Sequence, residues 1–215
     1  YHKGEHEKQF AYEAHTVCDR HGMVLGVKVT AGNVHDSVAW DEVYEQAARR
    51  FPEIQYVTMD AGYKQPWIAK RILEDGRLPI LPYTRPHGTR REGFMPWDFS
   101  YEEENDRLIC PQGQVLRHTT TDKGGKRTYR STPKVCRDCP CRKECGASAN
   151  GQKVIYRHIW QDAMDAAEQI RKTDVGKGLY AMRKQTIERV FADAKEKHAM
   201  RYTHHIGSGR KLGHA

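Results

Sequence analysis

The pattern of apolar and polar positions in the first part of the chain is typical of two short strands. Residues 8–18 mix aromatic and β-branched residues, residues 23–30 are typical of a second strand, and a turn ending in Gly22 joins them. This pattern predicts an antiparallel hairpin. After a loop, a helix is expected from about Val38, with Ser37 or Asp36 as its N-cap.

A second group of short elements follows. An apolar strand is expected at residues 56–59, then a helix beginning at Pro66 and a strand at residues 78–81. Asp60 comes directly after the first of these strands, where an open α/β sheet presents its reactive groups. Taken alone, Asp60 is better explained as a cap on the turn that contains Gly62.

The regular pattern stops between residues 82 and 157, where no helical period is sustained. Short β-prone pieces such as residues 114–116 make this a β-prone insertion. An amphipathic helix is expected from about residue 158, and Gly176 and Gly178 separate it from a longer helix at residues 180–202. The pattern therefore divides the chain into residues 1–81, an insertion at residues 82–157, and a helical part at residues 158–215.

The longer helix carries an apolar stripe. A step of about 100° per residue places Ile187, Phe191, Ala194 and His198 on one side, which should face a core. Glu188 lies at the edge of this stripe. Its position suits either a solvated surface carboxylate or a metal ligand at the boundary of a core.

Two lysines share the bearing of Glu188 on this helix. Lys184 lies one turn before the carboxylate, and Lys195 lies two turns after it. A solvated row of this kind stabilises a helix by roughly 0.2–0.5 kcal/mol per pair. Periodicity alone favours this surface row over a functional site.

The composition points to a heavily charged surface. The chain has 215 residues, of which 38% are hydrophobic and 30% are charged. Its mean hydropathy is −0.86, its formal net charge is +8 and its pI is about 9.2. This charge balance suits a polyanionic partner, most simply nucleic acid, whose binding is driven by phosphate neutralisation.

The sequence also carries information about the compartment. No stretch approaches the roughly 18–20 apolar residues that a membrane span needs, and the N-terminal residues lack the apolar segment of a secretory signal. We therefore expect an intracellular protein without a membrane partner. The first residue is Tyr1 rather than Met, which indicates a fragment or a processed chain.

The insertion contains most of the cysteines. Cys136 and Cys139 form a CxxC pair that can chelate one metal ion, and two further thiolates would complete a tetrahedral zinc site. The alternative is a set of free thiols in a loosely packed insertion. Cys18, alone on a strand, is expected to be a buried thiol.

Three segments resemble the bacterial insertion-sequence transposases of the DDE class. They are AGNVHDS at residues 31–37, MDAGY at residues 59–63 and QTIERVFADAKEKH at residues 185–198. The resemblance covers nearly the whole chain, from residue 2 to about residue 202.

The C-terminal signature of that family is a Tyr, two residues, an Arg, three residues, a Glu, six residues and a Lys. Tyr180, Glu188 and Lys195 match the ends of this signature. Arg183 has the correct spacing from Tyr180, but four residues separate it from Glu188. Lys184 has the correct spacing to Glu188 instead, so the sequence leaves open which cation does the arginine's work.

The resemblance implies an α/β fold of the ribonuclease H-like type, a mixed sheet flanked by helices and interrupted here by the cysteine-rich insertion. That fold begins with three antiparallel strands, and the first strand carries the first catalytic Asp. Only two strands precede the first helix here, so the first strand and its Asp are expected upstream of Tyr1. Asp19 and Asp36 are the candidates if that expectation is wrong.

The resemblance also implies the chemistry. A DDE enzyme attacks a phosphodiester in line, first with water and later with a DNA 3′-hydroxyl, using two divalent ions roughly 3.5–4 Å apart. Asp60 and Glu188 would be catalytic residues and ligands of Mg²⁺ or Mn²⁺. The residues expected to hold DNA phosphates near the cut are Tyr180, Arg183 or Lys184, Lys195 and Arg201.

Cys110 and Cys145 are the preferred partners of the CxxC pair in a zinc site, because the family resemblance extends to a cysteine-rich insertion with a CPxG sequence and a later Cys. Cys141 is the alternative to Cys145. Basic tracts at residues 85–91 and 123–130 suggest contact with the DNA backbone, which gives no sequence specificity.

The expected function is therefore a DNA transposase catalytic domain acting on double-stranded DNA, both transposon ends and target, in the bacterial cytoplasm at the nucleoid. Two alternatives remain: an inactive zinc-containing DNA-binding remnant of a transposase, and a ribonuclease H-like nuclease that cleaves without joining strands. The sequence leaves open whether a homodimer forms on DNA.

Overall fold

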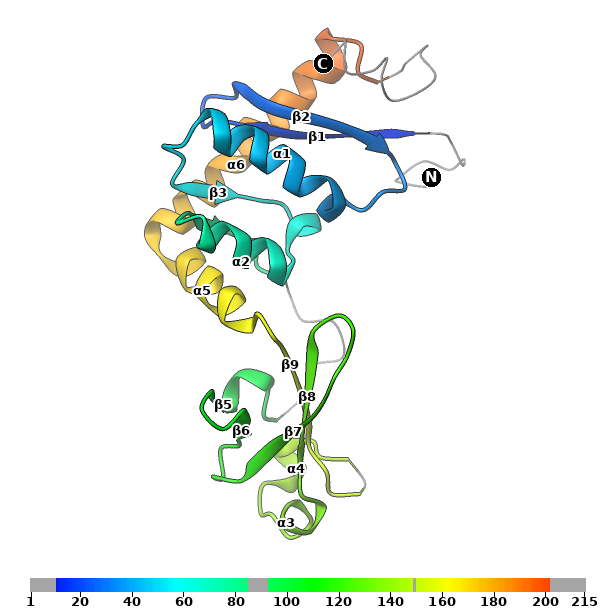
Figure 1. Cartoon of the computed structure of the whole chain (residues 1–215), viewed down its shortest axis with the longest axis vertical. Coiled ribbons are helices and arrows are strands. Elements are labelled where there is room, and N and C mark those ends of the chain that lie inside the picture. Colours follow the sequence, from blue (N-terminus) through cyan, green and yellow to red (C-terminus); the bar gives the residue numbers. More distant parts are fainter. Residues whose placement is uncertain (1–10, 85–92, 149, 202–215) are drawn as a thin grey trace. The chain divides into compact units, whose positions relative to one another are not determined.

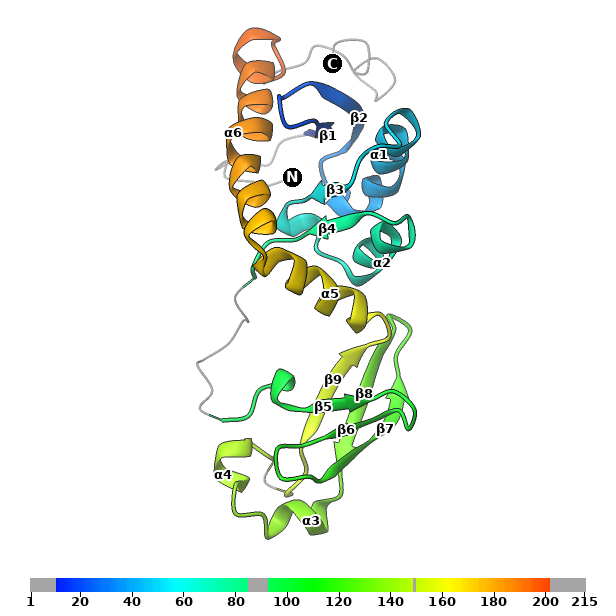
Figure 2. The ribbon, with the colours of Figure 1, turned by 90° about the vertical axis from the view of Figure 1, so that its left-hand side faces the viewer.

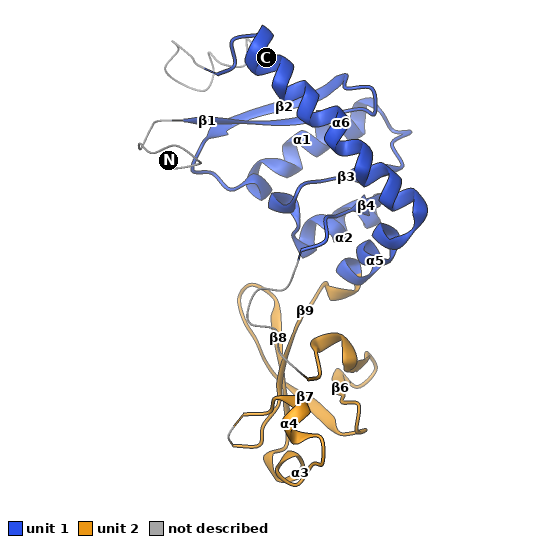
Figure 3. Cartoon of the chain, turned by 180° about the vertical axis from the view of Figure 1, so that it is seen from behind, with its two compact units in different colours: residues 1–84, 163–215 blue, residues 85–162 orange. Residues whose placement is uncertain are grey.

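The computed structural model describes residues 11–84, 93–148 and 150–201. Contacts divide the chain into two compact units (Figure 3): unit 1 is Tyr1–Thr84 with Ala163–Ala215, and unit 2 is Arg85–Asp162. Among the described residues, no helix combines the length and apolar character that crossing a membrane requires.

Unit 1 begins with the expected hairpin. β1 (Tyr12–Cys18) pairs antiparallel with β2 (Val24–Ala31). Asp19 closes the turn between them, because its Oδ1 accepts hydrogen bonds of 2.8 Å from the backbone N–H groups of His21 and Met23. The structure therefore gives Asp19 a turn role.

A parallel strand pair forms the other sheet of unit 1. β3 (Tyr56–Thr58) pairs with β4 (Leu78–Ile80), and the crossover between them contains the short helix η1 (Ala61–Tyr63) and α2 (Pro66–Glu74). Pro66 is the first residue of α2, where its missing N–H has no helical partner to lose. The expected strand–helix–strand order is confirmed.

The helix between the two strand pairs is α1 (Asp36–Arg50). Its N-cap is His35, whose Nδ1 accepts a hydrogen bond of 3.2 Å from the backbone N–H of Ser37. The expectation that Ser37 or Asp36 caps the helix is wrong, because α1 begins two residues earlier than its apolar pattern indicates.

The four strands of unit 1 form two separate sheets, because β1 and β3 are not paired with each other. Helices link the two sheets: α1 contacts β1, β2 and η1, whereas α6 (Asp174–Lys197) contacts β1, β3 and β4 (Figures 1 and 2). The unit is thus a mixed α/β structure, as the sequence predicts.

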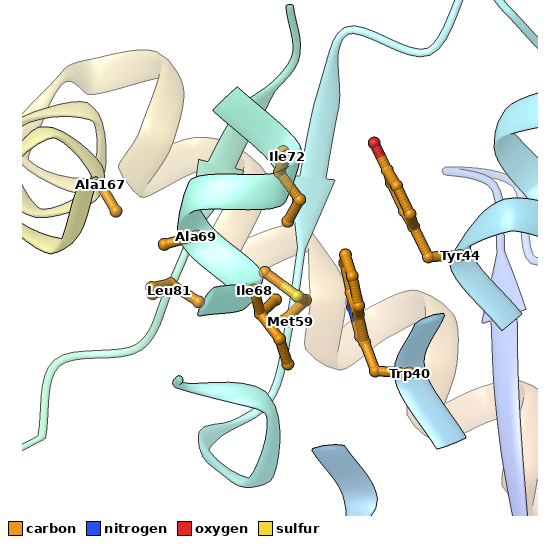
Figure 4. Packing of buried hydrophobic residues seen from close by; sticks show 8 residues of the cluster. All are labelled: Trp40, Tyr44, Met59, Ile68, Ala69, Ile72, Leu81 and Ala167. Atoms are coloured by element: carbon orange, nitrogen blue, oxygen red, sulfur yellow. The ribbon is translucent and has the colours of Figure 1, made fainter. Parts of the chain in front are cut away.

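The core of unit 1 lies between α1, α2 and α5 (Gln161–Lys172) (Figure 4). Trp40 stacks on Tyr44 with ring centroids 4.5 Å apart. The buried residues of this core are Trp40, Tyr44, Met59, Ile68, Ala69, Ile72, Leu81 and Ala167. Because Met59 is among them, the core fixes the chain immediately before Asp60.

The boundary between α5 and α6 differs from the expectation. α6 begins at Asp174, and Thr173 caps it by accepting a hydrogen bond of 3.0 Å from Gly176 N–H. Gly176 and Gly178 therefore lie inside the helix rather than before it. Gly176 is buried, and a Cβ there would lie 2.1 Å from the Ile170 carbonyl oxygen, so only glycine permits this close approach.

The other end of α6 also differs, because the helix ends at Lys197. His198 is its C-cap and is exposed, so it does not join the buried stripe as expected. Ile187, Phe191 and Ala194 are half-buried, as the stripe predicts. The expected end at residue 202 lies outside the described residues.

Unit 2 is better ordered than its sequence pattern suggests. Its described residues contain a five-stranded antiparallel sheet in chain order, the short helix η2 (Pro96–Asp98), α3 (Pro133–Arg137) and α4 (Arg142–Cys145). The strands are β5 (Ser100–Glu102), β6 (Arg107–Ile109), β7 (Val115–Thr121), β8 (Lys126–Ser131) and β9 (Val154–His158). Phe99, Leu108, Leu116, Tyr129 and Ile155 form its core. The alternative of a loosely packed insertion is therefore wrong for the described part of this unit.

Candidate functional site

Asp60 lies at the C-terminal end of β3 and is the N-cap of η1. Its Oδ1 accepts a hydrogen bond of 2.5 Å from the backbone N–H of Ala61. The capping role that the sequence allows is therefore present. The side chain is nevertheless 61% exposed, so the carboxylate keeps oxygen lone pairs that a cation can use.

Arg183 joins Asp60 to α6. Its Nη1 lies 3.7 Å from Asp60 Oδ2, and its guanidinium lies 5.4 Å from the centroid of the Tyr180 ring. The Arg183 side chain is only 18% exposed, and its Nε is buried without a hydrogen-bond partner in the described part of the chain. Lys184, by contrast, is exposed. Of the two cations that the sequence leaves open, Arg183 is the one that contacts the site.

The remaining expected residues of α6 lie on its exposed surface. Glu188 and Lys195 are both exposed, and Arg201, just beyond the helix, pairs with Glu196. Within the described residues, no hydrogen bond, ion pair or metal-sized cluster joins Glu188 to Asp60. The structure thus brings Asp60 to the helix that carries Glu188, through the contact with Arg183.

A second group of polar residues lies next to Asp60, and only Asp36 among them is a candidate from the sequence. Glu13, His15 and Asp36 each offer a ligand atom, and these atoms lie within 4.8 Å of one another. His15 is only 2% exposed, and its ring nitrogens form hydrogen bonds of 2.9 Å with Tyr63 Oη and Thr30 Oγ1. Alternation along β1 places Glu13 and His15 on one face, but their approach to Asp36 depends on the fold.

Tyr63 lies among these carboxylates. Burial, together with the negative charges of Asp36, Glu13 and Asp60, raises the pKa of the Tyr63 hydroxyl well above its usual range. The phenol therefore stays protonated at neutral pH. Three carboxylates from three segments of the chain thus act on one buried hydroxyl.

Gly62 brings the segments AGNVHDS and MDAGY into contact. A Cβ at Gly62 would lie 2.0 Å from Asp36 Oδ2 and 3.2 Å from Asp36 Cβ, so no larger residue fits without moving Asp36. The two motifs therefore meet at a glycine, which explains why this residue type is needed beside Asp60.

Changing Gly62 to Ala is expected to lower the free energy of unfolding of unit 1 by about 1–3 kcal/mol, because the added methyl group overlaps Asp36. Gly178→Ala is the control. Gly178 lies in α6 with no atom within 4 Å of an added Cβ, so this change should stabilise the unit by roughly 0.5–1 kcal/mol. Urea unfolding of both variants measures the difference, and equal effects of the same sign would contradict the proposed close contact.

The cysteines of unit 2 form a separate site. Cys110, Cys136, Cys139 and Cys145 all line a cavity of about 20 Å³. This volume exceeds the roughly 10–15 Å³ that one water-sized sphere needs. Cys141 is not among the lining residues, although it was the alternative fourth ligand.

Two groups beside this cavity can stabilise anionic sulfur, whereas burial acts against it. Cys110 Sγ accepts a hydrogen bond of 3.3 Å from the backbone N–H of Gln114. The ammonium group of Lys153 donates to the backbone oxygens of Cys145 and Phe94 and thus adds a positive charge beside the thiols. Burial raises the pKa of Cys145, and the Lys153 charge opposes that shift.

The four thiols line one cavity, but their sulfur atoms are farther apart than in a zinc site. Within the described residues, no three of their Sγ atoms lie within 4.8 Å of one another. In a tetrahedral zinc site, Zn–S bonds of about 2.3 Å bring the sulfur atoms roughly 3.8 Å apart. The side chains would therefore have to turn inward to bind an ion.

Comparison with known protein families identifies the family of this chain. Residues 109–214, about half of the chain, match the family model described as the transposase DDE domain. The chain belongs to the DDE transposase family. Neither the curated proteins nor the solved structures gave a match.

Membership of the DDE transposase family indicates an enzyme of DNA transposition that binds DNA and uses divalent metal ions. The matched range contains Glu188 and the four cysteines of the cavity, whereas Asp60 lies outside it. The family match therefore supports the class of protein, and the individual site residues remain predictions.

Proposed function

We propose that this chain is the catalytic core of a transposase that cuts and joins DNA strands at the ends of an insertion sequence. The observation that carries this proposal is the contact of Asp60 with Arg183 of α6. It connects the carboxylate at the end of β3 with the helix of the family signature, two segments that are more than a hundred residues apart in the sequence.

Asp60 and Glu188 would hold divalent ions, since exposed carboxylate oxygens suit Mg²⁺ or Mn²⁺. Such ions, when bound, activate the attacking oxygen and stabilise the leaving oxygen of a phosphodiester. Arg183 would hold a DNA phosphate beside Asp60, since its guanidinium already lies there. Tyr180 positions Arg183 through ring contact, and Lys184, Lys195 and Arg201 would bind phosphates farther along the DNA.

A third carboxylate completes the proposal. Among the described residues, β1 and β3 belong to separate sheets, although α6 contacts both strands. A strand upstream of Tyr1, placed between them, would convert the two sheets into one ribonuclease H-like sheet and carry the first catalytic Asp beside Asp60. Asp36 is the alternative third carboxylate, because it already lies in a metal-sized cluster with Glu13 and His15.

The second candidate function is a DNA-binding remnant without catalysis. One observation favours it: Glu188 is exposed and has no contact with Asp60 among the described residues. A ribonuclease H-like nuclease would share the catalytic geometry, and only a strand-transfer assay distinguishes it from a transposase.

The decisive experiment is divalent-metal-dependent cleavage of a labelled DNA duplex by this chain and by the same chain extended upstream. If only the extended protein cuts, the third carboxylate lies upstream. If the chain as given cuts and Asp36→Asn abolishes the cleavage, Asp36 is the third carboxylate. If neither protein cuts in Mg²⁺ or Mn²⁺ while both bind DNA, the chain is a DNA-binding remnant without catalytic activity.

We also propose a structural zinc ion in unit 2, bound by Cys110, Cys136, Cys139 and Cys145. The shared cavity, the hydrogen bond to Cys110 Sγ and the charge of Lys153 support it. Such an ion would hold α3 and α4 against the sheet. Cys110 directly follows β6, Cys136 lies in α3, Cys139 lies between the two helices, and Cys145 is the last residue of α4. Zinc at thiolates and magnesium at carboxylates would occupy different places, as their ligand preferences require.

A further inference from the structure

Three arginines lie side by side across the sheet of unit 2. Arg107 of β6 is directly opposite Arg117 of β7, and Arg117 is directly opposite Arg130 of β8. Residues opposite each other on neighbouring strands have Cβ atoms about 4.5–5.5 Å apart, and like charges in such pairs destabilise a sheet. The fold keeps this row in spite of that repulsion.

The row lies on the face opposite the core. Leu116, Tyr129 and Ile155 are buried, and the residues next to them in each strand therefore point to the other side. Arg117 and Arg130 are exposed there. Lys126, four residues before Arg130 in β8, and Tyr156 of β9 share this face. Lys126 Nζ lies 4.0 Å from the centroid of the Tyr156 ring, and Tyr156 is 54% exposed.

The cations of the two faces differ in their partners. On the core side, Arg127 pairs with Asp106 at 3.2 Å, and Arg157 pairs with Asp162. On the outer face, Arg107 is neutralised by Glu102 at 2.6 Å, at the edge of the row.

The centre of the outer face has no such neutralisation. Arg130 donates to the neutral side chain of Gln152, at 3.2 Å. β7, β8 and β9 contain no Asp or Glu, and no carboxylate pairs with Arg117, Lys126 or Arg130 within the described residues. A row of like charges without carboxylate partners in the described part of the chain is complementary to a polyanion.

We propose that this face of unit 2, formed by Arg117, Arg130 and Lys126 beside Tyr156, binds the sugar–phosphate backbone of duplex DNA. The inference rests on the proposed transposase function for the identity of the polyanion, because a transposase meets DNA. Guanidinium groups donate to phosphate oxygens bidentately, and phosphate binding would relieve the repulsion within the row. Such contacts position DNA without reading its sequence.

The test uses the full chain and a duplex of random sequence, without divalent metal. The double variant Arg117→Gln with Arg130→Gln is compared with Lys134→Gln with Lys143→Gln, which removes the same charge from exposed positions in α3 and α4. Fluorescence anisotropy gives the affinity at several salt concentrations. Each lost phosphate contact should reduce the slope of log K against log salt by about 0.9.

The arginine variant should therefore lose about two units of slope and should bind random and transposon-end duplexes more weakly by the same factor. The lysine variant should keep the slope of the unchanged chain. The melting temperature of the arginine variant should stay equal or rise, because the repulsion is gone. Lys126→Gln alone should reduce the slope by about half as much, which gives a second reading if the double variant folds poorly.

Equal slopes for the arginine and lysine variants would overturn the inference, as would weaker binding of only one duplex sequence. These results are independent of cleavage. If the chain does not cut DNA in Mg²⁺ but shows the arginine-dependent slope, the DNA-binding face stands and the proposed catalysis fails. If the arginine variant cuts DNA normally and keeps its slope, the proposed catalysis stands and the DNA-binding role of this face is rejected.

Discussion

Changing Glu188 to Gln is expected to lower metal-dependent DNA cleavage about a thousandfold while leaving DNA affinity in the absence of divalent ions nearly unchanged. The substitution removes one charge from a proposed metal ligand, and a bound ion contributes several kcal/mol to stabilising the transition state, each 1.36 kcal/mol being about tenfold in rate. Because Glu188 is exposed, the fold should tolerate the change. Asp60→Asn should act in the same direction.

Single-turnover cleavage of a labelled transposon-end duplex measures this effect in the upstream-extended chain. Glu196→Gln is the matched control, since Glu196 is another exposed carboxylate of α6 and pairs only with Arg201 among the described residues. Equal rates for the Glu188 and Glu196 variants would rule out Glu188 as a metal ligand. If cleavage persists after Asp60→Asn, Asp60 at the end of β3 is not a metal ligand of the active site.

The second large effect is expected for the cysteine cavity. The protein purified with zinc in the medium should contain about one zinc ion per chain, and Cys136→Ser should reduce this content to near zero. Loss of the ion should also unfold α3 and α4, because structural zinc contributes on the order of 10 kcal/mol to the folding of small domains. Elemental analysis and near-ultraviolet circular dichroism measure the two consequences.

Cys141→Ser and Cys18→Ser provide the comparison. Cys141 does not line the cavity, and Cys18 lies in unit 1, so both variants should keep the zinc content of the unchanged chain. If Cys141→Ser loses zinc and Cys145→Ser keeps it, the fourth zinc ligand is Cys141 rather than Cys145. A chain without zinc in every preparation would leave the cavity as a pocket of free thiols.

Local patterns were sufficient for most elements of unit 1. The strand predicted within residues 8–18, the proline at the start of α2 and the apolar strand before Asp60 are properties of a few neighbouring residues, and the structure confirms each of them, with β1 at Tyr12–Cys18. Local geometry requires no knowledge of distant contacts, since backbone sterics and hydrogen bonding within a short segment already select it.

Patterns failed where a distant part of the chain decides the outcome. Gly176 and Gly178 are read as helix breakers, but α6 includes both because Gly176 packs against the end of α5. The β character of unit 2 was predicted, but the extent of its sheet was not, for a related reason. Its strands are short, and Arg, Lys and Thr occupy their outer faces, so the buried positions alone do not form a recognisable period.

The sites show the same division. Asp60 and Glu188 are identifiable from their motifs, and the CxxC pair is identifiable from its spacing. The sequence could not choose between Arg183 and Lys184, because both lie on one helix. The choice came from packing, since the turn of α6 places Arg183 against β3 and leaves Lys184 in solvent.

The sequence by itself determined the charge of this protein, the order of its elements, the cysteine motif and the resemblance to DDE transposases, all of which depend on residue type and spacing. Only the tertiary structure decided which groups meet: Asp36 with Gly62, Arg183 with Asp60, four cysteines around one cavity, and arginines across neighbouring strands. The physical reason is that charge and local spacing are fixed along the chain, whereas proximity between distant residues depends on strand register and on helix packing.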